Sequence, residues 1–302
     1  MVKLKIGSIV FLGVLGISLS SGVFAKSLDN SKSSDEWVGY GEAFGVLSFN
    51  GTETWNTGSV TNEEWNGSQF GLSGHAGRHI NDVMSIQIDA SAQNARVIYN
   101  STRANDTWTY IGSAFHGTFH LSDTFYFGPL VSIGQMNYSL TSTSGYATLG
   151  LEAIYDSGDY RLYLQTGQVM AVSGIEASHD VRDIYAMFLA TYYLNPNLAL
   201  SGTAGFDRYT SDDQNNWYNP TIETRFGVRL DYKPETMPFT IFATLSAWQW
   251  GGDYASGAST FKGGSDYFYL GLALPLGPKS IKEMHQRVGL IDFNPMYGQF
   301  NY

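Results

Sequence analysis

The chain has 302 residues, of which 17 are basic and 27 acidic, and it contains 34 glycines, 15 % aromatic residues and no cysteine. Charged residues make up 15 % of the sequence, well below the roughly 25 % usual for soluble domains. The lack of cysteine excludes a disulfide scaffold and a Cys-ligated zinc or iron–sulfur centre. The net charge of −10 argues against duplex nucleic acid as a partner, because neutralising phosphates requires a basic surface.

The N-terminal segment has the features of a secretory signal. Lysines precede an apolar stretch, and Val23 and Ala25 occupy the −3 and −1 positions of a cleavage site. The apolar stretch, about 14 residues, is shorter than the roughly 20 that a transmembrane helix needs. We therefore predict a signal peptide over residues 1–25, followed by a linker over residues 26–36 and an exported mature protein.

Alternation of apolar and polar residues characterises residues 37–276. In the clearest run, residues 222–232, Phe226, Val228 and Leu230 share one face while charged residues occupy the other. Such period-two alternation over about 10 to 14 residues is typical of strands with two different faces. The runs predict strands at residues 37–49, 68–79, 83–95, 108–121, 124–138, 145–156, 160–172, 183–194, 198–209, 221–233, 239–250 and 265–276.

The connections between these strands alternate in length. After every second strand the link is a tight turn, as at 122–123 and 195–197, whereas most of the other links are long and polar, as at 51–67 and 251–264. A closed barrel also pairs every backbone group without leaving a sheet edge, which a hydrocarbon environment requires. We predict an all-β fold over residues 37–276. It is a transmembrane antiparallel up-and-down β-barrel of about 12 strands, with short periplasmic turns and longer extracellular loops.

Aromatic residues gather at both ends of the predicted strands. Two aromatic belts are expected where amphipathic rings lie at the level of the lipid headgroups. A soluble β-sandwich or barrel with an aromatic core is the alternative, and it would turn the charged strand faces toward solvent. The residues near the turns are Phe125, Phe127, Tyr160, Tyr192, Tyr193, Tyr232 and Phe239, and those near the loops are Trp108, Tyr110, Tyr138, Tyr146, Tyr209, Trp248 and Trp250.

The signal, the twelve alternating segments over residues 37–276 and the aromatic strand ends resemble a bacterial outer-membrane β-barrel of the porin-like kind. The resemblance implies location in the outer membrane of a Gram-negative cell. It implies as partners the outer-membrane lipids, small hydrophilic solutes or ions, and the outer-membrane assembly machinery, and it leaves a homo-oligomer open. Such barrels commonly end with their last strand, whereas here residues 277–302 follow it. We expect this segment to be a C-terminal periplasmic tail.

The sequence lacks the common catalytic fingerprints, including the G-x-S-x-G elbow, H-E-x-x-H and the Walker loop. The nearest approach to a site is a pair of histidines on one predicted strand face, His116 and His120, with a second pair, His75 and His79, on another. Residues i and i+4 on a strand lie about 13 Å apart, too far to bind one ion. We therefore expect no catalytic residues, no cofactor and no metal.

Two alternatives to this expectation remain open. A Ser–His hydrolase in the barrel wall would need Ser85 or Ser113 beside a histidine on a neighbouring strand, and the sequence does not fix that register. The loop carboxylates of Asp212 and Asp213 offer the oxygen ligands that hard cations favour, but a solvated loop is the simpler interpretation.

If the polar strand faces line the interior, acids and bases share the wall of the lumen. Mixed charges on facing walls create a transverse field that sorts solutes by charge and size. We predict an outer-membrane channel for passive diffusion of small hydrophilic solutes or ions. The alternatives are a non-conducting surface barrel for adhesion or support, or an outer-membrane hydrolase. The predicted pore-lining residues are Asp89, His116, His120, Glu152, Arg161, Glu223, Arg225, Arg229 and Asp231.

Overall fold

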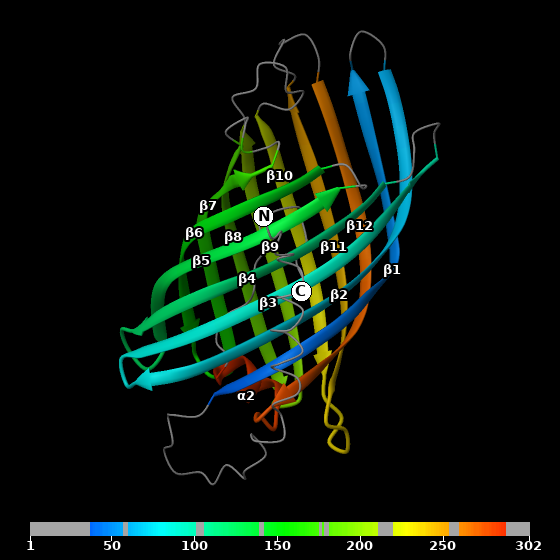
Figure 1. The fold of residues 1–302 in the computed structure, drawn as a ribbon. Coiled ribbons are helices and arrows are strands. Elements are labelled where there is room, and N and C mark those ends of the chain that lie inside the picture. Colours follow the sequence, from blue (N-terminus) through cyan, green and yellow to red (C-terminus); the bar gives the residue numbers. More distant parts are fainter. Residues whose placement is uncertain are drawn as a thin grey trace, which may run out of the picture.

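The computed structural model describes residues 37–56, 60–100, 106–138, 142–174, 177, 181–210, 220–253 and 260–287. Within these ranges the strands form one closed antiparallel barrel, in which each strand pairs with its neighbours in sequence and β1 pairs with β12 (Figure 1). The elements are β1 (Val38–Asn56), β2 (Val60–Asn81), β3 (Met84–Tyr99), β4 (Asp106–His120), β5 (Phe125–Tyr138), β6 (Ser142–Asp156), β7 (Tyr160–Ser173), β8 (Arg182–Asn195), β9 (Leu198–Thr210), β10 (Thr221–Tyr232), β11 (Thr240–Asp253), β12 (Thr260–Leu276) and α2 (Ile281–Arg287). This architecture confirms the predicted all-β, twelve-stranded barrel.

The predicted signal peptide (1–25) and linker (26–36) lie outside the described residues. Among the described residues, no helix has the length and apolar character needed to cross a membrane.

The two faces of the barrel wall have opposite chemistry. On β3, Ile88 is 42 % exposed on the outer face, whereas the next residue, Asp89, is fully buried inside. On β8, Ile184 and Phe188 are 57 % and 43 % exposed on the outer face. An apolar outside around a polar inside is the reverse of a soluble barrel and matches a wall that faces lipid. The soluble alternative, which turns the charged faces toward solvent, is therefore wrong.

The strand limits agree with the sequence prediction at one end of the barrel and differ at the other. At the end with the tight turns (the turn end), predicted and observed limits agree within two residues. At the opposite end (the loop end), β1 continues to Asn56, β2 begins at Val60 and β12 begins at Thr260. The long links predicted over 51–67 and 251–264 are therefore wrong, because most of these residues belong to paired strands.

The reason for this error is chemical. The outer face of the extensions carries threonine, asparagine, glutamate and lysine instead of apolar residues, as at Thr54, Glu64 and Lys262. Alternation of apolar and polar residues then disappears, although main-chain pairing continues. The hairpins β1–β2 and β11–β12 extend beyond the rest of the wall (Figure 1).

Glycine residues provide space for large rings inside the barrel. Gly271 on β12 pairs with Phe44 of β1 on one side and with Phe242 of β11 on the other. A Cβ atom at Gly271 would overlap the Phe242 ring and lie 2.6 Å from the carbonyl oxygen of Ala43. Both phenylalanine rings are buried. Glycine at this position lets two rings and the backbone approach closely.

Gly271→Ala is expected to lower the free energy of unfolding by about 1–3 kcal/mol, because the added methyl group forces the ring and the neighbouring strand apart. Gly74→Ala is the matched control, since no atom lies within 4 Å of a Cβ atom at Gly74. Its stability should change by no more than about 0.5 kcal/mol. Urea titration, monitored by heat-modifiable gel migration, measures the free energy of unfolding of both variants. Equal losses of stability in the two variants would contradict the steric explanation.

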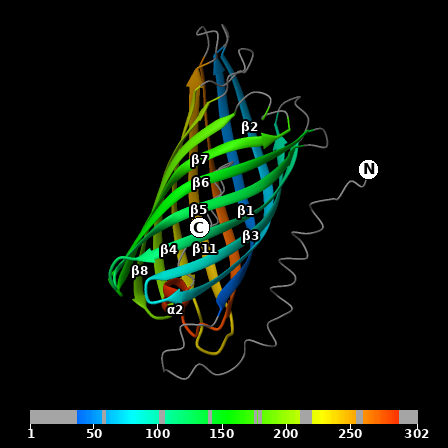
Figure 2. The same ribbon diagram turned by 60° about the vertical axis from the view of Figure 1, so that its left-hand side comes forward.

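A short helix, α2, lies at the turn end of the barrel (Figures 1 and 2). Its first turn is capped from both directions. The backbone N–H of Glu283 donates to Oγ of Ser280 (3.1 Å), and Oε2 of Glu283 accepts from the backbone N–H of Lys279 (2.8 Å). These bonds satisfy donors that a helix start would otherwise leave unpaired.

The apolar residues of α2 join it to the barrel interior. Ile281 packs in a buried cluster with Tyr193 and Ala199, and Met284 belongs to the buried cluster that includes Phe242. The segment 277–302 therefore begins with a helix docked on the lumen, which sequence patterning did not indicate. The periplasmic location of this segment stays a prediction.

Candidate functional site

The lumen brings the sequence-predicted residues together on the inner face of the wall. Two of them, His120 and Glu223, are half-buried and the other seven are buried. They fall into three ion-pair networks and one small cavity. The nine residues are Asp89, His116, His120, Glu152, Arg161, Glu223, Arg225, Arg229 and Asp231.

The first network runs from β2 to β7 through buried histidines and carboxylates. Nδ1 of His75 lies 3.0 Å from Oδ1 of Asp89, and Oδ2 of Asp89 lies 2.7 Å from Nε2 of His116. Nδ1 of His116 lies 3.0 Å from Oε2 of Glu152, which also accepts a hydrogen bond from the Tyr163 hydroxyl (3.0 Å). Both ring nitrogens of His116 therefore lie within ion-pair distance of a carboxylate, Nε2 of Asp89 and Nδ1 of Glu152.

The second network crosses the barrel between strands that do not pair. Nη2 of Arg229 on β10 lies 2.7 Å from Oε1 of Glu42 on β1 and 2.7 Å from Oδ1 of Asp231. The guanidinium carbon lies 3.8 Å from the centroid of the Phe242 ring. All four side chains are buried. The arginine thus holds two carboxylates in the lumen and stacks on an aromatic face.

The third network lies toward the loop end. Nη2 of Arg225 lies 2.9 Å from Oδ2 of Asp207 and 2.7 Å from Oε2 of Glu223. Its guanidinium carbon lies 5.4 Å from the Trp248 ring centroid. Asp207 and Trp248 were not among the predicted residues. The sequence did contain a signal for both residues. They occupy inward positions of β9 and β11, and these positions alternate with apolar outward residues as they do on β10.

Ser85 lies between two histidines at the turn end. Its Oγ is 2.8 Å from Nδ1 of His79 and 2.7 Å from Nε2 of His120. Nδ1 of His120 is 3.2 Å from the backbone oxygen of Asp82. A carbonyl only accepts, so the neutral His120 ring carries its proton on Nδ1, and its Nε2 accepts the Ser85 hydroxyl proton. The register between β3 and β4 therefore places Ser85 within hydrogen-bonding distance of His120, as a Ser–His pair requires.

The space around this pair is small. A cavity of about 40 Å³, lined by Ser85, His120, Arg161 and others, adjoins it, and such a volume accommodates only a few water molecules. The other candidate serine, Ser113, pairs with Ala90 on the outer face and lies beside no histidine in the β3–β4 and β4–β5 registers. Ser85 and His120 thus make the contact of a Ser–His pair beside a small cavity.

Metal ligands do not assemble in the described ranges. There, no group of three or more histidine, aspartate or glutamate side chains has an arrangement that could hold a metal ion. The loop carboxylates of Asp212 and Asp213 lie outside the described residues.

Among the described residues, the predicted aromatic belt on the outside is found at the turn end alone. There, Phe127, Tyr192 and Tyr232 are exposed on the outer face, as expected, whereas the prediction is wrong for Tyr193, which is buried inside against Ile281. At the loop end the prediction is wrong, because the rings turn inward. The alternation of side chains along a strand explains this inward orientation, because each of these rings lies on the same face as the polar lumen residues of its own strand. The inward-facing residues are Trp108, Tyr110, Tyr146, Trp248 and Trp250.

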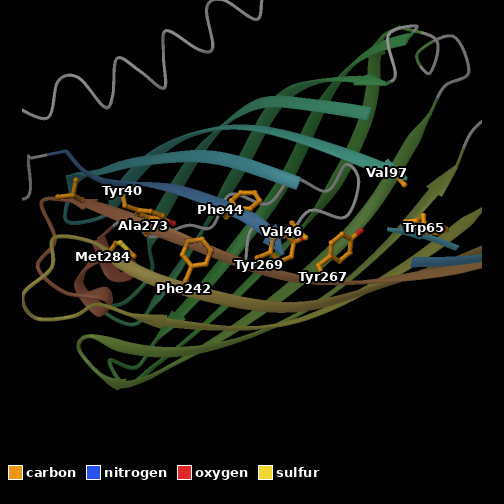
Figure 3. Packing of buried hydrophobic residues seen from close by; sticks show 11 residues of the cluster. Tyr40, Phe44, Val46, Trp65, Val97, Phe242, Tyr267, Tyr269, Ala273 and Met284 are labelled. Atoms are coloured by element: carbon orange, nitrogen blue, oxygen red, sulfur yellow. The ribbon is translucent and has the colours of Figure 1, made fainter. Parts of the chain in front are cut away.

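These inward rings continue along the wall formed by β1, β2, β11 and β12. Tyr267 and Tyr269 are stacked with centroids 5.7 Å apart, and Tyr269 meets Phe44 edge to face at 5.8 Å. Figure 3 shows these rings on the inner side of the wall, in line with Trp65 toward the loop end. Aromatic rings therefore line the lumen on this wall and, through Tyr110, Tyr146, Tyr163 and Tyr185, on the wall formed by β4 and β6–β8.

Comparisons with known proteins address the fold. No protein-family model matches the sequence, and no curated protein matches it. An outer membrane channel from Pseudomonas putida F1 is similar in structure, with a TM-score of 0.57 and 12 % identity over 82 % of this chain and 99 % of that one. The translocator domain of the autotransporter NalP from Neisseria meningitidis gives a TM-score of 0.45, with 13 % identity over 89 % of this chain and 97 % of that one. A Pseudomonas aeruginosa FadL homologue gives 0.44, with 8 % identity over 80 % and 90 %.

The fold is that of a bacterial outer-membrane β-barrel. At 12 % identity the likeness to the Pseudomonas putida channel extends to the fold alone.

Proposed function

We propose that the protein is an outer-membrane channel for small hydrophilic solutes or ions, with a preference for cations. The observation that carries this proposal is the excess of carboxylates over guanidinium groups on the inner face of the described strands. A wall with one dominant sign of charge raises the local concentration of counter-ions. The inner carboxylates belong to Glu42, Glu53, Glu63, Asp89, Asp106, Glu152, Asp156, Asp183, Asp207, Glu223 and Asp231, and the guanidinium groups to Arg161, Arg225 and Arg229.

The mid-barrel is closely filled by side chains. Gln165 on β7 is fully buried, and neither polar atom of its side chain has a hydrogen-bond partner among the described residues. Its burial leaves no space for an open water column at this level. Because ion pairs and apolar clusters occupy much of the same level, we infer a narrow passage in place of a wide aqueous pore.

The location and the remaining partners belong to the same proposal. The apolar outer face supports insertion in the outer membrane, with residues 1–25 as the export signal. The proposal assigns no enzymatic activity, since the Ser85 pair has too little space for a substrate. Outer-membrane lipids and the assembly machinery are the expected partners, and self-association is an outcome that cross-linking in membranes would reveal.

The test is ionic conductance of the purified protein in planar lipid bilayers. In a salt gradient, we expect a reversal potential of the sign that marks cation preference. Arg225→Gln should increase that preference, because it removes a positive charge beside Asp207 and Glu223. A folded barrel that stays electrically silent would eliminate the channel and favour the non-conducting surface barrel.

A further inference from the structure

The loop end of the lumen holds two indole rings, each bonded to a carboxylate. Nε1 of Trp248 donates to Oε2 of Glu223 (2.9 Å), and Nε1 of Trp250 donates to Oε1 of Glu53 (3.2 Å). All four side chains are half-buried, so they present surface to the lumen. With Trp65 these four residues form what we call the vestibule. Each indole is held in place by a negative group at its edge.

The rings of the vestibule form a continuous aromatic wall. Trp65 and Trp250 are stacked with centroids 5.5 Å apart, and Trp248 and Trp250 are 4.5 Å apart. Glycines create the room for this wall, since a Cβ atom at Gly51 would overlap the Trp65 ring and one at Gly263 would overlap the Trp250 ring. The local sequence is thus adapted to hold large flat rings against the strands.

Negative charge is concentrated beside this wall. Glu53 on β1 pairs directly with Glu63 on β2, and both are half-buried. Like charges directly opposite each other on a sheet face destabilise the pairing. Two carboxylates therefore lie on the same face of this hairpin beside the indole rings.

The protein's own side chains indicate which cations suit such surroundings. Arg225 lies over Trp248 and bonds Asp207 and Glu223. Deeper in the lumen, Arg229 lies over Phe242 between carboxylates in the same way. In both places a guanidinium group is held by an aromatic face and by carboxylates together.

We propose that the vestibule binds organic cations, namely solutes in which a guanidinium or ammonium group adjoins a flat apolar body. The aromatic faces attract the cation through the ring quadrupole and bury the apolar body, and the carboxylates supply the opposite charge. The inference rests on the proposed channel function, since it names the class of cation that the channel takes. Binding itself does not require conduction, so the two can fail separately.

The experiment uses the full-length barrel in detergent micelles and follows tryptophan fluorescence during titration with phenylguanidinium chloride. Phenylurea, which has a similar shape and no charge, is the matched ligand. We expect saturable binding of phenylguanidinium and at least about tenfold weaker binding of phenylurea, because a charged group contributes more to each hydrogen bond.

Two variants and a control locate the binding site. Glu53→Gln removes one charge of the vestibule, and Trp250→Leu removes its central ring. Each should weaken phenylguanidinium binding about tenfold. Glu235→Gln is the control, because Glu235 is exposed in the turn between β10 and β11 at the opposite end of the barrel, and it should leave binding unchanged. Heat-modifiable gel migration shows that each variant is folded.

Equal affinity for phenylurea, or unchanged binding in both Glu53→Gln and Trp250→Leu, would overturn the vestibule inference. A barrel that binds phenylguanidinium but conducts no ions in bilayers would overturn the channel and leave the vestibule standing. A barrel that conducts ions but binds phenylguanidinium no more tightly than phenylurea would overturn the vestibule inference and leave the channel standing.

Discussion

Arg229→Met is expected to lower the free energy of unfolding by about 3–5 kcal/mol, because removal of one partner leaves buried charges uncompensated. Glu42 and Asp231 both contact this guanidinium group and are themselves buried. In the variant, the two carboxylates would face each other in the lumen without a counter-charge. Urea titration of the refolded barrel in micelles measures the loss.

Two further variants separate charge from packing. Arg208→Met removes an exposed arginine from the outer face of the neighbouring strand β9 and should change stability by about 0.5 kcal/mol or less. The triple variant Arg229→Met, Glu42→Gln and Asp231→Asn removes the whole network and should recover most of the stability that Arg229→Met alone loses. If the triple variant were as unstable as the single one, the loss would come from packing and not from uncompensated charge.

Replacing Ile281 and Met284 together by aspartate is expected to release α2 from the turn end and to raise the conductance of the barrel several-fold. Both residues are fully or almost fully buried. Burying unpaired carboxylates costs several kcal/mol each, more than the docking of a helix of seven residues can offset. Bilayer recordings and limited proteolysis of the released segment measure the two consequences.

The surroundings of α2 supply the control for this variant. Lys282→Ala removes an ion pair with the exposed Asp159, whose atoms lie 3.7 Å apart, and such pairs contribute little. Its conductance should match that of the unmodified protein.

Burial lowers the pKa of His285 to about 4, so the helix brings no imidazolium charge to the lumen at neutral pH. Unchanged conductance together with cleavage of the released segment would show that α2 does not close the passage.

The sequence by itself determined the strands, the turn-end limits and which face of each strand meets lipid. These properties are local, because period-two alternation and turn residues act within a few positions of one another. At 184–194, for example, the alternating apolar residues were enough to identify the outer face of β8. Prediction failed where alternation ended although pairing continued, as in β1 beyond residue 49.

Only the tertiary structure decided which charges meet and which serine lies beside a histidine. Glu42 and Arg229 are 187 positions apart in the chain, and they touch because barrel closure leaves only β12 and β11 between β1 and β10. Register between distant strands likewise places Ser85 beside His120 and leaves Ser113 on the outer face. No local pattern contains such information, because the pairing partner of a strand face is fixed only when the sheet closes on itself.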